Sequence, residues 1–276
     1  MEEIQAGLRG VLRLFYFVLV IGTYLTWSFC CHLVIRDEDK RRARFSKNAS
    51  FFCGVILKLF NMRLTVVNKP KDGEKFLLVS NHMGFIDILL MCSIFPMLFI
   101  TSNEMRETPF LGLLTEMAGC MYVERRSRTK ILEEMKSMIH ALQKGFRIVL
   151  YPEATSHNGE EVLPFKRTLM MAASHAGVPI QPAVVNFRKV NGEEWTMKYR
   201  DHLCWYGDIS FATSLWKALT LKSLDAEIEF LEQIHTTPED DRGLIADRAY
   251  KLISEKFVPV KGRTEQGQPP AEMETT

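Results

Sequence analysis

The stretch VSNHMGFIDILL, residues 79–90, joins two kinds of sequence pattern at one point. The residues FLLVS (76–80) form a short apolar run that is typical of a buried strand, and the residues after the junction, as far as Phe95, form an apolar run of helical length. His82 and Asp87 lie where the two runs meet. The stretch therefore predicts a strand that leads directly into a helix, with two ionisable side chains at the turn.

On the C-terminal side of residue 61, short β-rich runs alternate with helical runs. The predicted strands are 63–67, 76–80, 97–101, 120–123, 147–151, 180–185, 195–199 and 226–231, and the predicted helices are 86–95, 109–118, 129–144, 166–176, 211–220 and 239–257. Continuous apolar strands that alternate with helices indicate an α/β fold, here expected as a mixed sheet covered by helices. Sites in such folds gather where strands end and helices begin, which makes the turn at His82 a candidate site.

The N-terminal part of the chain is expected to associate with a membrane. Between Leu14 and Ile35 the only ionisable side chains are those of tyrosine, cysteine and histidine. A helix of this length reaches about 33 Å, enough for a hydrocarbon core of roughly 30 Å. A cleaved signal peptide would have a shorter apolar part that ends in small residues, so we expect a retained anchor. The sequence leaves open whether this segment spans the bilayer or lies in its interface.

The flanking residues suggest a domain organisation and an orientation. A second apolar stretch, residues 49–60, is too short to span, so it is either an interfacial helix or the first core helix. We expect an N-terminal membrane region at 1–60, a catalytic domain at 61–260 and a disordered polar tail at 261–276. The larger basic cluster follows the apolar segment and predicts that the domain stays on the cytoplasmic side; its members are Arg36, Lys40, Arg41, Arg42 and Arg44.

Charge and cysteine content exclude several classes of function. The formal net charge of +2 on 276 residues is too balanced to indicate a nucleic-acid partner. The six cysteines form no C-x-x-C pair, and most lie in apolar surroundings. They are expected to be small buried hydrophobic residues in a reducing compartment, and neither a disulfide framework nor a zinc site is predicted.

His82 and Asp87 can act together only because they lie at a junction. On one regular helix, a separation of five residues would place them about 140° apart. At a strand-to-helix turn, Asp87 can accept a hydrogen bond from one imidazole nitrogen and leave the other nitrogen basic, with Gly84 allowing the tight turn between them. The competing interpretation is structural: a capping histidine with an aspartate that is favoured by the helix dipole.

Four stretches in order resemble the motifs of the glycerolipid acyltransferase family, typified by 1-acylglycerol-3-phosphate acyltransferases. They match N-H-x-x-x-x-D, G-x-x-[FY]-x-x-R, [FY]-P-E-G-T and V-P-[IV]-x-P, and the matching residues are Asn81, His82 and Asp87; Gly119, Tyr122 and Arg125; Tyr151, Pro152, Glu153 and Thr155; and Val178, Pro179, Ile180 and Pro182. One such motif would be weak. Four in this order, within a resemblance that covers about residues 60–235, are specific.

The resemblance implies a membrane-bound enzyme that moves a fatty acyl group from acyl-CoA or acyl carrier protein to a lysophospholipid. The first expectation for the acceptor is 1-acylglycerol-3-phosphate, which would become phosphatidate. His82 would be the general base and Asp87 its orienting partner. No metal, no cofactor beyond the acyl thioester and no nucleic acid are expected. Predicted substrate-binding residues are Asn81, Arg125, Glu153, Thr155 and Lys166.

Two departures from the family pattern leave the acceptor open. Ala154 replaces the usual glycine of the third motif, which is costly if the backbone there has a positive φ. Ser156 stands where many phosphatidate-forming members have arginine. A lyso-ornithine lipid or a lysophospholipid with a head group is therefore an alternative acceptor. Rival classes are a hydrolase that uses the same His–Asp pair on water and a non-catalytic lipid-binding module.

Two further stretches carry expectations about location and the acyl chain. Residues 205–219 look like bacterial members of the family, which predicts a bacterial inner membrane. The apolar run FIDILLMCSIFPMLFI (85–100) could contribute to an acyl tunnel, although most of its residues are expected to be ordinary core.

Overall fold

The computed structural model describes residues 1–124 and 128–262. The predictions for Arg125 and for nearly all of the 261–276 tail therefore fall outside the described residues.

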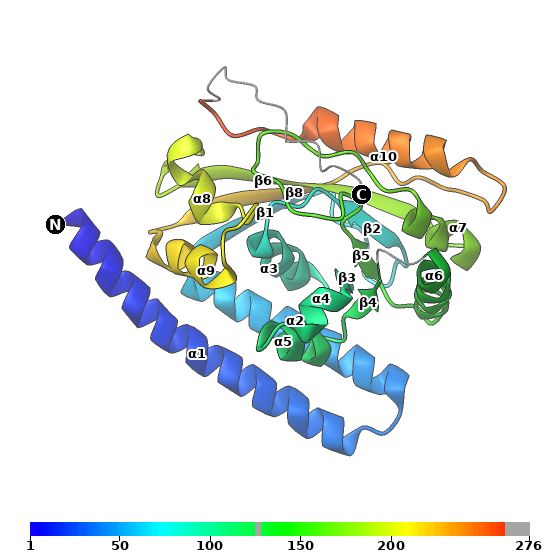
Figure 1. The fold of residues 1–276 in the computed structure, drawn as a ribbon, viewed down its shortest axis with the longest axis horizontal. Coiled ribbons are helices and arrows are strands. Elements are labelled where there is room, and N and C mark those ends of the chain that lie inside the picture. The colour runs from blue at the N-terminus through cyan, green and yellow to red at the C-terminus, as the bar shows by residue number, and fades with distance from the viewer. Residues whose placement is uncertain (125–127, 263–276) are drawn as a thin grey trace, which may run out of the picture.

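A single mixed sheet forms the centre of the described chain (Figure 1). Every pairing along it is parallel except that of β6 with β8, and the short β7 (Glu193–Glu194) pairs antiparallel with β6 at its edge. The predicted mixed α/β sheet is confirmed. The strand order is β1 (Met62–Val67), β8 (Leu224–Phe230), β6 (Ile180–Val190), β2 (Leu77–Ser80), β5 (Ile148–Leu150), β3 (Leu98–Ser102) and β4 (Met121–Val123).

Helices cover both faces of the sheet, which explains why its central strands are continuously apolar. In β2, Leu78 packs into the core on one face while Leu77 and Val79 pack into the core on the other. The first face carries α1 (Glu2–Val34), α2 (Glu38–Leu59), α3 (Phe85–Ile94) and α9 (Phe211–Thr220), and the second carries α6 (Arg128–Gln143), α7 (Ala172–Ala176) and α10 (Arg242–Lys256). Shorter helices are α4 (Asn103–Glu107), α5 (Leu111–Met117) and α8 (Arg200–Leu203).

The apolar N-terminal helix α1 packs along one side of the domain, next to α2 (Figure 1). Its length and hydropathy would suffice to cross a membrane. Its inner face packs Phe17 against Phe60 and directs the Tyr24 hydroxyl group to the carbonyl oxygen of Leu114 at 3.3 Å. Its outer face leaves large apolar side chains exposed, among them Phe15, Leu19 and Trp27.

Two arginines near the start of α1 bind the last turn of α9. Arg9 donates to the carbonyl oxygen of Thr220 at 2.6 Å, and Arg13 donates to those of Leu219 and Leu221. Carbonyl groups at a helix C-terminus lack partners within the helix and favour a nearby positive charge. These arginines therefore join α1 to the domain.

One predicted strand is wrong. Residues 195–199 form no strand: Trp195 packs edge-on against Phe187, and the chain continues as a 3₁₀ turn at Met197–Tyr199. The predicted helix 109–118 is present as α5, which directly follows the short helix α4. Gly112 lies at their contact, where an added Cβ atom would be 2.0 Å from the carbonyl oxygen of Arg106.

Candidate active site

Asn81 fixes the loop that follows β2. Its side-chain amide nitrogen donates to the carbonyl oxygen of Val185 at 3.0 Å, and its carbonyl oxygen accepts from the Val185 amide at 2.8 Å. The side chain is fully buried. The predicted substrate-binding role of Asn81 is therefore corrected, because both polar atoms are used to join the loop to β6.

His82 and Asp87 meet as the junction predicts. Nδ1 of His82 lies 3.0 Å from Oδ2 of Asp87, which also accepts from the backbone amides of Met83 at 2.6 Å and Gly84 at 3.0 Å. A buried carboxylate that accepts these hydrogen bonds assigns the proton of the imidazole to Nδ1. No described residue hydrogen-bonds Nε2, and the His82 side chain is 17% exposed, so a substrate can reach it.

Glycine is needed at position 84 because the backbone of residues 203–205 approaches it closely, and not because of the tight turn that the sequence predicts there. Its φ of 162° is extended backbone that other residues also adopt. A Cβ atom at this position would lie 3.0 Å from the backbone nitrogen of Trp205 and 3.2 Å from the carbonyl oxygen of Leu203. The Trp205 amide donates to the carbonyl oxygen of Met83 at 2.7 Å, which holds the 203–209 segment over the site.

Tyr151, at the end of β5, forms a stacking surface for the histidine. The Tyr151 and His82 rings are 4.1 Å apart and inclined by only 13°. Burial raises the pKa of Tyr151 well above its ordinary value, so the phenol stays neutral. The sequence placed Tyr151 in a motif, but the stacking could not be predicted without knowing that β5 lies next to β2.

Glu153 does not reach the predicted acceptor site, because its side chain is fully buried. Oε1 accepts from the backbone amide of His82 at 2.7 Å, and Oε2 accepts from that of Leu163 at 2.8 Å. Burial raises the pKa of Glu153 to about 8, partly offset by these two hydrogen bonds. The geometry thus fits a residue that positions His82 better than one that binds the acceptor.

The remaining predicted binding residues occupy different places. Thr155 is exposed and lines the cavity at His82. Lys166 is exposed and lines a neighbouring cavity of about 220 Å³ on the other side of Tyr151 and Ala154. Arg125 lies outside the described residues. Contact of Thr155 and Lys166 with substrate therefore stays a prediction.

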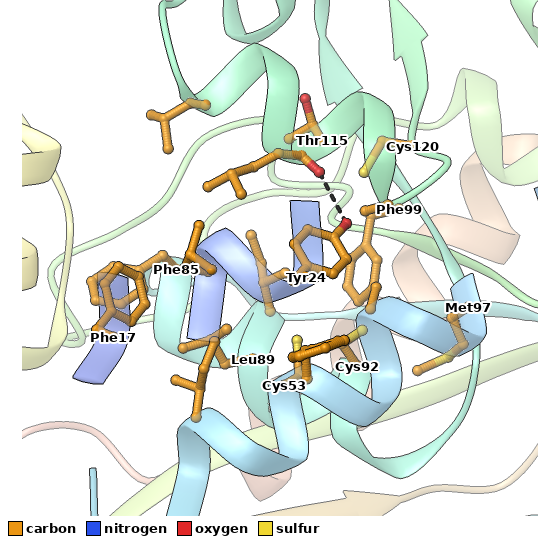
Figure 2. A pocket seen from close by; sticks show the side chains of 18 of the residues that line it. Phe17, Tyr24, Cys53, Phe85, Leu89, Cys92, Met97, Phe99, Thr115 and Cys120 are labelled. Atoms are coloured by element: carbon orange, nitrogen blue, oxygen red, sulfur yellow. Dashed lines mark hydrogen bonds between the residues drawn. The ribbon is translucent and has the colours of Figure 1, made fainter. Parts of the chain in front are cut away.

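The cavity at His82 has a volume of about 520 Å³ and adjoins an apolar one of about 190 Å³. The two share wall residues, including Phe85, Ile88 and Phe99, so the apolar cavity opens next to the histidine. Figure 2 shows Tyr24 of α1 lying across this apolar cavity, opposite side chains from α2, α3 and β3. Part of the 85–100 run therefore lines the cavity, while Ile86, Leu90 and Met91 are buried core.

Asp208 is a wall residue that sequence reasoning missed. It lies on the loop between α8 and α9, is exposed, and lines the cavity that contains His82. Its loop is held by hydrogen bonds from Trp205 Nε1 to the carbonyl oxygen of Ile209 at 2.6 Å and from the Ser156 hydroxyl group to that of Trp205. Ser156 thus supports the loop that carries Asp208.

These residues form a base next to an apolar cavity. Nδ1 of His82 is fixed by a carboxylate, Nε2 is available to take a proton, and the apolar cavity can hold a hydrocarbon chain. Such an arrangement suits the transfer of an acyl group to a hydroxyl group without a protein nucleophile.

Comparison with known proteins identifies the family. A family model described as Acyltransferase matches residues 62–186. A lyso-ornithine lipid O-acyltransferase of Brucella abortus is 31% identical over 251 residues, which cover 86% of this chain and 91% of that protein. This chain belongs to the acyltransferase family. The predicted resemblance is confirmed.

Other relatives of this acyltransferase differ in the acceptor that they are named for. A 1-acyl-sn-glycerol-3-phosphate acyltransferase of Neisseria gonorrhoeae is 26% identical over 184 residues, covering 67% of this chain and 70% of that one. The crystal structure of PlsC, the 1-acyl-sn-glycerophosphate acyltransferase of Thermotoga maritima, matches with a TM-score of 0.65 at 20% identity, covering 92% of this chain and 95% of that one. The latter match supports the fold.

Proposed function

We propose that this acyltransferase transfers a fatty acyl group from acyl-CoA or acyl carrier protein to the hydroxyl group of a lysolipid. The observation that carries the proposal is the His82–Asp87 pair, 3.0 Å apart, in a cavity that shares wall residues with an apolar one. His82 Nε2 removes the proton of the acceptor hydroxyl group as its oxygen attacks the thioester carbonyl carbon. The carbon–sulfur bond then breaks, and the imidazolium returns the proton to the leaving thiolate.

Each neighbouring residue has one task in this mechanism. Asp87 holds the imidazole tautomer and stabilises the imidazolium, and a positioned base of this kind contributes about 10²–10⁴-fold to the rate. Tyr151 stacks against the imidazole ring of His82, and Glu153 accepts a hydrogen bond from the backbone amide of His82. The apolar cavity beside His82 receives the acyl chain.

We propose a lyso-ornithine lipid as the acceptor. Ornithine carries a primary amino group that is positively charged at neutral pH, and Asp208 offers a carboxylate in the wall of the His82 cavity. Ser156 supplies no positive charge for a phosphate group, and its hydroxyl group is used by Trp205. The name of the Brucella relative supports the same acceptor.

The second candidate acceptor is 1-acylglycerol-3-phosphate, the first expectation from the sequence. The name of the Neisseria relative favours it. Lys166, in the neighbouring cavity, could contact a phosphate group.

We also propose that the outer face of α1 holds the enzyme on a membrane. Exposed Phe15, Leu19 and Trp27 provide the apolar contact. A bacterial inner membrane, with the domain on the cytoplasmic side, remains the location favoured by the basic residues that follow α1.

An acceptor panel tests the function. Purified enzyme in detergent receives labelled palmitoyl-CoA or palmitoyl-acyl carrier protein with lyso-ornithine lipid, lysophosphatidate, or lysophosphatidylglycerol. We expect esterification of lyso-ornithine lipid, and a loss of about 10²–10⁴-fold in the His82→Ala variant. Faster transfer to lysophosphatidate would identify that lipid as the acceptor and leave the assignment as an acyltransferase unchanged. Release of fatty acid without transfer to any acceptor would instead indicate a hydrolase.

The Asp208→Asn variant tests whether Asp208 recognises the amino group of the acceptor. It removes the negative charge with little change in size, so we expect a KM for lyso-ornithine lipid raised about tenfold. The rate with lysophosphatidate, which has no amino group, should stay the same or rise. An equal effect on both acceptors would refute the role of Asp208 in recognising the amino group.

A further inference from the structure

His157 is a buried histidine that the proposed mechanism does not use. Its side chain is only 2% exposed, and Phe257 packs edge-on against its ring. Nε2 makes no hydrogen bond with the described residues and lies 3.7 Å from Oε2 of Glu153. A buried polar atom without a partner is rare enough to require an explanation.

The 153–157 segment holds both backbone polar groups of His82. Glu153 Oε1 accepts from the His82 amide at 2.7 Å, and the backbone amide of His157 donates to the His82 carbonyl oxygen at 2.9 Å. Residue 82 is therefore fixed from two sides by one short segment. Any change in Glu153 acts directly on the backbone that carries the catalytic imidazole.

The tautomer of His157 follows from a backbone donor. The amide of Gly159 donates to Nδ1 at 3.0 Å, so Nδ1 carries no proton and Nε2 does. The Nε2–H group lies 3.7 Å from Oε2 of Glu153, beyond hydrogen-bond distance but near enough for an electrostatic attraction. The described groups around the Glu153 carboxyl group are donors: the amides of His82 and Leu163 hydrogen-bond to it, and the Nε2–H dipole of His157 lies close by. All three favour negative charge on the carboxylate.

We propose that His157 is a positioning residue: its Nε2–H group favours the ionised form of Glu153, which in turn holds the backbone of His82 in place. This inference rests on the proposed function of His82. Nothing in the four family motifs includes position 157.

The charges around the pair give the expected dependence on pH. Burial lowers the pKa of His157 to about 4 and raises that of Glu153 to about 8, and the other titratable groups that act on the pair are Asp87 and His82. His157 is therefore neutral near pH 7, and Glu153 ionises as the pH rises through about 8. Because the ionised form is the active one, kcat/KM should rise over that range.

Two amide substitutions separate the roles of the two imidazole nitrogens. In His157→Gln the amide nitrogen can reach the place of Nε2 and keep the donor to Glu153. In His157→Asn the amide oxygen can reach the place of Nδ1 and keep the bond from Gly159, but the donor to Glu153 is lost. His140→Asn, at an exposed histidine of α6, is the matched control.

We expect His157→Asn to lower kcat roughly tenfold to a hundredfold with KM little changed, and to move the rising limb of the pH profile upward. His157→Gln and His140→Asn should stay near wild type. Equal losses in the Asn and Gln variants, or no loss in either, would overturn the proposal. If the Asn variant does not fold, shown by its melting curve, the Gln variant decides: a large loss there also overturns it.

A second measurement needs no substrate. Hydrogen–deuterium exchange of the peptide that contains the His82 amide should be faster in His157→Asn than in wild type or His157→Gln. If the wild-type enzyme acylates no acceptor, the proposed function is refuted. The exchange result still tests whether His157 acts through Glu153 on the backbone of His82. Unchanged exchange in the Asn variant would refute the contact even if the enzyme is active.

Discussion

The backbone of Ala154 adopts a left-handed conformation, with φ of 62°. The third motif of the family usually has glycine here, and the strain anticipated for alanine is present. A side chain with a Cβ atom costs about 1 kcal/mol in this region, which glycine avoids. The turn is nevertheless formed, since the Ala154 amide donates to the carbonyl oxygen of Tyr151 at 3.1 Å.

We expect Ala154→Gly to raise the free energy of unfolding by about 1 kcal/mol, because it removes this strain. Thermal unfolding in detergent measures the change. Ala43→Gly, within helix α2, serves as the control and should lower stability, since glycine weakens a helix interior. A lower melting temperature for Ala154→Gly would mean that the methyl group contributes more through packing than it costs in strain.

The pairing of His82 with Asp87 could be predicted from the sequence, since both residues lie on one local turn. The roles of Asn81 and Glu153 could not. Their partners, Val185 and Leu163, lie 104 and 10 residues away and are brought close only by the sheet and by the loop after β5. Motif residues that look like substrate contacts are here the supports of the loop that carries the base.

At the scale of elements, the contact between α1 and α9 depends on side chains that the sequence presents as membrane flanks. Arg9 and Arg13 stand beside the apolar segment in the sequence. In the fold they bind carbonyl groups more than 200 residues away. Local periodicity predicts most of the strands and helices, but it holds no information on contacts between distant elements. The β-rich composition of 195–199 predicts a strand that is absent, because Trp195 is buried outside the sheet.

Arg13→Met should lower the free energy of unfolding by about 1–3 kcal/mol, because buried carbonyl groups of Leu219 and Leu221 lose a charged donor. Methionine keeps most of the apolar stem. The change is read from thermal unfolding, with Arg36→Met at an exposed position as the control. If the two variants melt alike, the arginine contacts contribute little to the docking of α1.

At the scale of the whole molecule, helix α1 packs against the domain with one face and exposes apolar side chains on the other. The inner face of α1 joins the main core through Phe17, Ile21 and Tyr24, and the outer face exposes apolar side chains. A helix that stood alone across a bilayer would not make these lateral contacts with the domain. The arrangement favours α1 lying in the interface, one of the two topologies that the sequence left open.

Replacing Phe15 and Leu19 together by glutamate should weaken binding to vesicles more than tenfold, since the change removes two apolar contacts with the bilayer. Flotation with phosphatidylethanolamine–phosphatidylglycerol vesicles measures the effect. Wild-type binding should persist in 1 M salt, because it is mainly apolar. Leu132→Glu, an equally exposed leucine on α6, is the control. Loss of wild-type binding at high salt would point instead to the basic residues.

The position of Tyr24 across the apolar cavity has a practical consequence for anyone who shortens this protein. The apolar helix at residues 2–34 is the segment that one would remove to make a more soluble enzyme. Here such a truncation would also take away Phe17, Ile21 and Tyr24 from the cavity wall and leave the apolar cavity open to water. Inactivity of the shortened protein would then report a damaged binding site, and it could not be used to argue that catalysis needs a membrane.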